Sequence, residues 1–140
     1  MKTIELMVGD WVCLKDDTKC ELPLKVDGVL IDDISLEGEG FLGGVEGLIR
    51  PIPLTPEILE KNGFEMFKYD GWVHYYRIFG NSAIPFVLHS MIGGEMLSQE
   101  VDIFSTSTNT NCGIDVNYVH ELQHALRLCR LNKLADNFKL

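Results

Sequence analysis

One pentapeptide near the C-terminus matches a motif that carries chemistry. Residues 120–124 read His-Glu-Leu-Gln-His, the H-E-x-x-H pattern of zinc peptidases. On a helix, His120 and His124 lie one turn apart on one face, where both can ligate Zn²⁺. Glu121 stands beside them, where it can act as a general base. The pattern raises the hypothesis of a zinc-dependent hydrolase with His120 and His124 as metal ligands and Glu121 as the catalytic residue.

The helix around the motif argues against that hypothesis. At roughly 100° per residue, its apolar side chains form one stripe, and the two histidines point to the opposite side. The stripe consists of Tyr118, Val119, Leu122, Ala125, Leu126 and Cys129. Arg127 shares the histidine face, where its charge opposes a dication. We therefore expect both histidines on an exposed polar face.

The chain also lacks a recognisable third ligand. A metzincin-type site needs Gly and His where this sequence has Arg127 and Arg130. No glutamate follows Glu121, so a Glu ligand from a later helix is missing too. His74 and His89 precede the motif at no recognised spacing. We expect no cofactor, with zinc as the alternative.

A glycine-rich match has a simpler interpretation. Residues 38–43, GEGFLG, fit the G-x-G-x-x-G pattern of dinucleotide-binding folds. That pattern works when a helix follows and receives the pyrophosphate at its N-terminus. Here GVEGLIRPIP follows, which cannot open a helix. The segment is predicted to be a hairpin or a bulged strand.

An aromatic segment is the predicted binding surface. Residues 69–79 read YDGWVHYYRIF, and on a strand Tyr75 and Arg77 project from the same face. An aromatic ring beside a guanidinium can stack on a planar ligand or anchor a protein partner. We predict Trp72, Tyr75 and Arg77 as ligand-binding residues. The alternative is that another part of the chain covers this face.

Charge and composition narrow the class of protein. The formal net charge is −9, which opposes general nucleic-acid binding because phosphate backbones are anionic. Residues 127–140 carry four basic side chains against one acid, a polarity that favours self-association or docking on an acidic partner. The sequence has no apolar run long enough for a membrane span and no signal peptide. We expect a cytoplasmic protein.

The cysteines show no recognised metal-binding or redox motif. The chain has four, and none of them forms a C-x-x-C pair. In a chain without an export signal we expect them to be reduced thiols, at least partly buried.

The predicted elements belong to an α+β fold. Residues 1–54 read as a small N-terminal β-rich, SH3-like lobe, with turns at Gly9-Asp10 and Asp27-Gly28. Residues 55–140 are predicted to form a second, compact part with a short helix, an antiparallel β-meander and a C-terminal amphipathic helix from about Asn117 to Asn132. This last helix is expected to pack across the meander.

The short helix has clear boundary signals. Thr55 is its predicted N-cap, Pro56 takes the first helical position, and Gly63 supplies the C-terminal stop. The meander that follows is marked by turn signals at Asp70-Gly71 and Gly80-Asn81. A further turn is predicted at 93–94, and a polar loop at 105–111.

Three stretches of the chain resemble one family. They are MVGDWV near the start, IRPIPLTPEILEKNGF in the middle and YVHELQHALRLC at the end. Together they resemble an uncharacterised family of small proteins from gut-bacterial genomes, prophages and phages. In that family the final helix commonly reads V-H-x-L-Q, and Asn often stands at the position of His124. The resemblance implies a mobile-element accessory protein with a structural, not metal-ligating, final helix.

The sequence therefore predicts a non-enzymatic binding protein of phage or mobile-element origin. We expect it to form a homo-oligomer and to bind either a small nucleotide-like ligand, such as a host defence signal that it sequesters, or a host protein. One alternative is the zinc hydrolase that uses the H-E-x-x-H residues. The other is a purely structural interaction protein.

Overall fold

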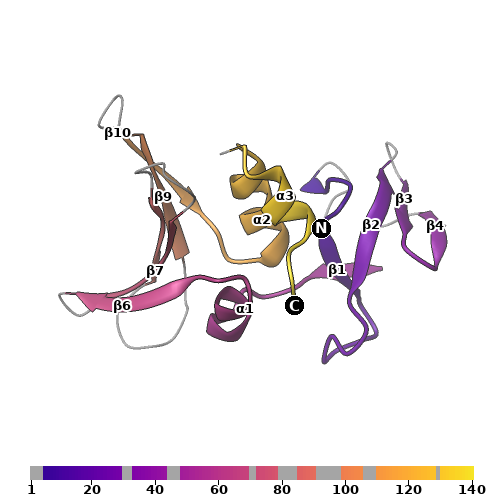
Figure 1. Cartoon of the computed structure of the whole chain (residues 1–140). Helices are drawn as coiled ribbons and strands as arrows, with labels where there is room; N and C mark the ends of the chain where they lie inside the picture. Colours follow the sequence, from indigo (N-terminus) through magenta and orange to yellow (C-terminus); the bar gives the residue numbers. More distant parts are fainter. Residues whose placement is uncertain are drawn as a thin grey trace. The chain divides into compact units, whose positions relative to one another are not determined.

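The computed structural model describes residues 5–29, 33–43, 48–69, 72–78, 85–90, 99–105, 110–128 and 130–140. The chain contains both helices and strands and is α+β (Figure 1). It divides into two compact units. The first unit contains Met1–Pro53 together with Tyr118–Asn137. The second contains Leu54–Asn117 together with Phe138–Leu140. Among the described residues, no helix is long and apolar enough to cross a membrane.

The described part of the first unit holds an antiparallel sheet and two helices. Its strands are β1 (Trp11–Leu14), β2 (Leu24–Val29), β3 (Asp33–Leu36), β4 (Gly40–Gly43) and β5 (Ile49–Pro51). They lie in the order β4-β3-β2-β1-β5, so β1 pairs with both β2 and β5. The apolar core of this unit is formed by Leu6, Val12, Val26, Ile34, Leu36 and Ile49.

Of the two turns predicted in this unit, one is present and one is wrong. Residues 7–10 form a turn and β1 follows it, but the described residues before it are not the predicted strand. The Asp10 N–H donates to the Met7 carbonyl at 3.1 Å, and the Asp10 side chain accepts from the Met7 N–H at 2.7 Å. Gly28, predicted to lie in a turn, is part of β2, where a bulge falls between Val26 and Gly28.

The glycine-rich segment is a hairpin, as predicted for the part that the structure describes. Leu36 of β3 pairs with Gly40 of β4, and the residues between them form a turn. Gly38 and Gly40 both have positive φ, 85° and 75°, a backbone that glycine adopts without steric cost. Residues 44–47 lie outside the described residues.

The predicted long C-terminal helix is two helices. α2 runs Val119–Leu128 and α3 runs Asn132–Asp136. Arg130 between them has a φ of 62°, in the left-handed region, and its N–H bonds to the Arg127 carbonyl. This left-handed residue ends the helical path and turns the chain back, so that α3 packs on α2.

Both helices belong to the first unit, with the N-terminal strands. Residues 118–137 thus join the N-terminal strands from the other end of the chain. The physical reason is a set of polar contacts between α2 and the turn before β1, described below. The predicted packing of the final helix across the meander stays a prediction.

The second unit contains the predicted antiparallel meander. α1 (Pro56–Lys61) is followed by β6 (Glu65–Tyr69), β7 (Trp72–Ile78), β8 (Pro85–Ser90), β9 (Gln99–Ser105) and β10 (Thr110–Asp115). The strands pair in sequence order, each antiparallel to the next. The predicted turns at 70–71, 80–81 and 93–94, and positions 106–109 of the predicted loop, lie outside the described residues.

The boundary signals of α1 are confirmed. Thr55 is the N-cap, and its hydroxyl accepts a hydrogen bond from the Ile58 N–H at 3.3 Å. Pro56 begins the helix, and Gly63 follows it with a φ of 79°. The C-cap residue Asn62 is buried and holds the end of the chain.

A substitution of Asn62 tests whether its hydrogen bonds to Lys139 stabilise the second unit. Its amide donates to the carbonyls of Ile58 and Lys139, each at 2.7 Å, and accepts from the Lys139 N–H at 2.8 Å. Asn62→Ala leaves these backbone groups without their partner, so we expect a loss of about 1–3 kcal/mol in the free energy of unfolding. Urea denaturation measures it.

Asn137→Ala is the matched control, because the exposed Asn137 amide makes only a local bond to the Lys133 carbonyl. We expect its unfolding free energy to stay within about 0.5 kcal/mol of the parent. Equal losses in the two variants would contradict the role assigned to Asn62.

Candidate functional site

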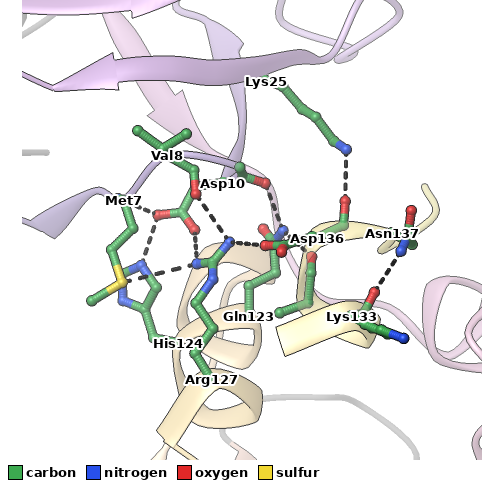
Figure 2. Close-up of polar contacts among 12 residues, drawn as sticks. Met7, Val8, Asp10, Lys25, Gln123, His124, Arg127, Lys133, Asp136 and Asn137 are labelled. Carbon is green, nitrogen blue, oxygen red and sulfur yellow. Dashed lines mark hydrogen bonds and ion pairs between the residues drawn. The ribbon is translucent and has the colours of Figure 1, made fainter. Parts of the chain in front are cut away.

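The H-E-x-x-H helix contacts the turn before β1 through a buried carboxylate. The side chain of Asp10 is fully buried, and its two oxygens are shared between two side chains of α2. Oδ2 lies 2.7 Å from His124 Nε2, and Oδ1 lies 2.6 Å from Arg127 Nη1. Figure 2 shows the carboxylate between the imidazole and the guanidinium. We call these three residues the Asp10 cluster.

Gln123 adds a second buried connection between α2 and the same turn. It is fully buried, and its side-chain oxygen accepts from the Trp11 N–H at 3.0 Å. Its amide nitrogen donates to the carbonyls of Gly9 and Ala135, each at 2.9 Å (Figure 2). One amide group thus satisfies the backbone of the turn, of β1 and of α3.

Arg127 makes further contacts between α2 and the turn, and its guanidinium lies close to Gly9. Its Nη2 donates to the Val8 carbonyl at 3.2 Å and approaches an Asp136 oxygen at 3.4 Å. A Cβ on Gly9 would come within 2.9 Å of this nitrogen, and Gly9 has a φ of 93°. The backbone conformation therefore favours glycine at this position, and a larger side chain would also displace the Arg127 guanidinium.

The predicted exposure of the motif histidines is wrong. His120 is only 5% exposed, and the side chain of His124 is 23% exposed. The polar face of α2 is not in solvent because the turn carrying Asp10 packs on it and supplies the counter-charge. Arg127, expected to repel a dication, pairs with Asp10 instead.

Glu121, the alternative catalytic residue, acts at the helix N-terminus. Its Oε2 accepts a hydrogen bond from the Tyr118 N–H at 3.0 Å. This is the Glu half of a capping box, which satisfies a backbone donor that the first turn of a helix leaves open. The three residues of the zinc hypothesis therefore have structural contacts: Glu121 caps α2, His124 binds Asp10 and His120 is packed inside.

His120 has a buried polar atom, Nδ1, whose hydrogen bonding is not satisfied by the described residues. Its ring stacks on Tyr118 at 6.0 Å between centroids and meets the edge of the His124 ring at 5.7 Å. Burial lowers the pKa of His120, although the negative charges of Glu121 and Asp10 act in the opposite direction. The imidazole is therefore held in its neutral form.

A different group has the side chains to hold a metal. Among the described residues, the only cluster of three or more potential ligands is Cys13, Asp17 and Cys20. The structure joins Cys13 and Cys20 in a disulfide, with 5.6 Å between their Cα atoms. The expectation of reduced thiols is wrong for this pair. A Cys-x6-Cys spacing gave no signal in the sequence, because the hairpin between β1 and β2 brings the two residues together.

The predicted aromatic surface is described only in part. Tyr75 is buried, 4% exposed, so its ring does not lie on an open face. Burial raises the pKa of its phenol, and the charges of Glu60 and Glu57 on α1 add to the effect. Trp72 and Arg77 lie in β7, but their side chains are outside the described residues. The binding role of the three stays a prediction.

Comparison of the chain with protein-family models, with curated proteins and with solved structures finds no match.

From the contacts of the Asp10 cluster, we predict that loss of the Asp10 carboxylate lowers the free energy of unfolding strongly. Asp10→Ala leaves Arg127 without its buried partner, and we expect the free energy of unfolding to fall by about 3 kcal/mol or more. Denaturant titration followed by circular dichroism measures the change. Asp16→Ala, an exposed acid in the same unit, should stay within about 0.5 kcal/mol of the parent. A small effect at Asp10 would mean that α2 is held by its apolar contacts alone.

From the burial of His120, we predict that the free energy of unfolding falls as the pH is lowered below about 6.5. Its pKa is lowered in the folded chain, so the unfolded chain binds more protons between that value and the ordinary pKa of about 6.5. Stability is therefore present above about pH 6.5 and is lost as the pH falls towards the folded pKa, by at most about 1.4 kcal/mol per pH unit. Glu5, Asp10, Glu121 and His124 are the charged or titratable groups that act on it.

Unfolding free energies at several pH values in this range test the effect, with His120→Gln as the comparison. The variant should show a flatter profile than the parent between pH 5 and 6.5, a range set by the ordinary pKa of about 6.5. Asp17 and Glu57 also have lowered pKa values, but their contribution is lost only at more acidic pH, below the ordinary carboxyl range. An unchanged profile in His120→Gln would exclude His120 as the source.

Proposed function

We propose that this chain is a non-enzymatic binding protein that acts in the cytoplasm as an accessory protein of a phage or mobile element, and that its partner is a host protein. The Asp10 cluster carries the proposal. His124 Nε2, which a zinc site would use, is 2.7 Å from a buried carboxylate, and Glu121 caps the helix. The residue pattern that suggested hydrolysis is thereby explained by folding.

The charge distribution favours a protein partner over a nucleotide. A phosphate ligand needs cationic side chains that are free to bind it. Three cationic side chains of the first unit are already engaged: Arg127 pairs with Asp10, Arg50 donates to the Asp17 carbonyl, and Lys25 donates to the Asp136 carbonyl. With a formal net charge of −9, the chain is better suited to a partner that presents basic groups.

The surface of the turn before β1 supports the same choice. Met7 and Val8 are 48% and 58% exposed, and both contact the Arg127 guanidinium, through the Met7 sulfur and the Val8 carbonyl. Methionine and arginine are enriched at protein interfaces. This turn is also rigid, because Asp10 and Gln123 bind its backbone. A pre-organised surface loses less entropy when a partner binds.

We also propose that the five-stranded first unit is an SH3-like lobe. The strand order β4-β3-β2-β1-β5 supports this, because a meander whose first strand also pairs with the last is arranged to curl into a small barrel. We also propose a homo-oligomer, supported by the opposite charges of the acidic N-terminal segment and the basic residues 127–140.

Quantitative affinity capture from a bacterial host lysate tests the partner. The purified chain should retain one host protein in stoichiometric amount, and the complex should re-form from the purified components. Val8→Asp places a charge at the turn and should weaken binding at least about tenfold, a cost of about 1.4 kcal/mol. Leu22→Asp, at another exposed apolar site in the unit, is the matched control and should bind as the parent does.

Two outcomes would overturn the proposal. Thermal stabilisation by a signalling nucleotide, without capture of a protein, would assign the small-molecule alternative. Hydrolysis by metal-loaded protein that is abolished in Glu121→Gln, a variant that remains folded, would assign the zinc hydrolase. Size-exclusion chromatography with light scattering checks the oligomeric state, and a monomer at all concentrations would exclude the homo-oligomer.

A further inference from the structure

The hairpin that joins β1 to β2 gathers three ligand-type side chains. The Sγ atoms of Cys13 and Cys20 and a carboxylate oxygen of Asp17 all lie within 4.8 Å of one another. Cys13 is buried in β1, whereas Asp17 and Cys20 are partly exposed. Cys13 therefore lies on the buried side of the cluster, and solvent reaches the side formed by Asp17 and Cys20.

We propose that, when Cys13 and Cys20 are reduced, these three residues bind one thiophilic divalent cation, with Zn²⁺ as the best fit. Zinc takes thiolate sulfur at about 2.3 Å and carboxylate oxygen at about 2.0–2.2 Å in a tetrahedron. Ligand atoms around such an ion lie about 3.5–3.8 Å apart, so the two sulfurs must separate when the disulfide is reduced, by an amount that keeps them within the 4.8 Å span of the cluster. The solvent side leaves the fourth position for water or for an atom of a bound partner.

Hydrogen bonds within the hairpin fix the orientation of Asp17, as they do for carboxylates that bind metals. Its two carboxylate oxygens accept from the N–H groups of Glu21 and Leu22, at 3.0 and 2.8 Å. Its carbonyl accepts from the Cys20 N–H at 3.0 Å and from the Arg50 guanidinium. Each carboxylate oxygen keeps a lone pair for a cation. Such hydrogen bonds fix the direction of a ligand before the metal arrives.

The charges at this site balance with a dication. Two thiolates and one carboxylate bring three negative charges. One divalent ion and the Arg50 guanidinium, whose Nε is 3.2 Å from the Asp17 carbonyl oxygen, neutralise them. A neutral total lowers the cost of keeping the partly buried site charged.

The metal and the disulfide are mutually exclusive. A dithiol reductant transfers two electrons and two protons to the Cys13–Cys20 disulfide, which yields two thiols and the oxidised reductant. Binding of the cation then releases those two protons, because the thiolates are the ligands. In a cytoplasm that keeps thiols reduced, the metal form is favoured. The site does not depend on the proposed partner binding.

Cobalt titration is the direct test. The full chain is reduced with a phosphine, freed of reductant without oxygen, and titrated with Co²⁺, whose thiolate complexes absorb in the near ultraviolet. We expect saturation at one Co²⁺ per chain, displacement by Zn²⁺, and no binding by the oxidised chain. Cys20→Ser should abolish the thiolate band, and Asp17→Asn should weaken affinity at least tenfold.

Two matched variants complete the design. Cys112→Ser removes a thiol outside the cluster, and Asp16→Asn neutralises the neighbouring acid, so both should titrate as the parent does. Circular dichroism verifies that each variant is folded, and the oxidised parent is a control that needs no substitution. Absence of stoichiometric binding by the reduced parent would overturn the proposal. So would binding that persists in Cys20→Ser or disappears in Cys112→Ser.

Discussion

The first unit depends on one buried carboxylate. Asp10 has no access to solvent, so its charge must be compensated inside the protein. His124 and Arg127, one turn apart on α2 by helical spacing, provide that compensation and thereby bind a C-terminal helix to the N-terminal turn. Removal of either element would leave the other with an unpaired buried polar group. Residues more than 110 positions apart in sequence are thus joined in one structural unit.

The parts of the fold that depend on local chemistry could be predicted from the sequence. The bounds of α1 follow from Thr55, Pro56 and Gly63, because capping involves neighbours in the chain. The meander follows from apolar and aromatic runs separated by turn residues, and its strands pair with their sequence neighbours. These features need no knowledge of what the rest of the chain does.

The candidate sites depend on contacts between residues that are not neighbours in the sequence, and the predictions of histidine exposure and of reduced Cys13 and Cys20 were therefore wrong. A helical wheel assigns only apolar side chains to the buried side, so it placed His120 and His124 in solvent. His120 is buried, and His124 is partly buried because the turn before β1 brings the Asp10 carboxylate to it. The pair Cys13 and Cys20 was missed for a related reason. Their spacing has no motif, and only the path of the hairpin brings them together.

We propose that the H-E-x-x-H residues stabilise the fold and do not bind a catalytic metal. A double-mutant cycle between Asp10→Asn and His124→Gln, measured by denaturant unfolding with metal analysis of each protein, tests it most directly. We predict a coupling free energy of about 0.5–3 kcal/mol, with a metal content that does not change on loss of His124. Zero coupling, together with stoichiometric zinc that is lost in His124→Gln, would contradict the account.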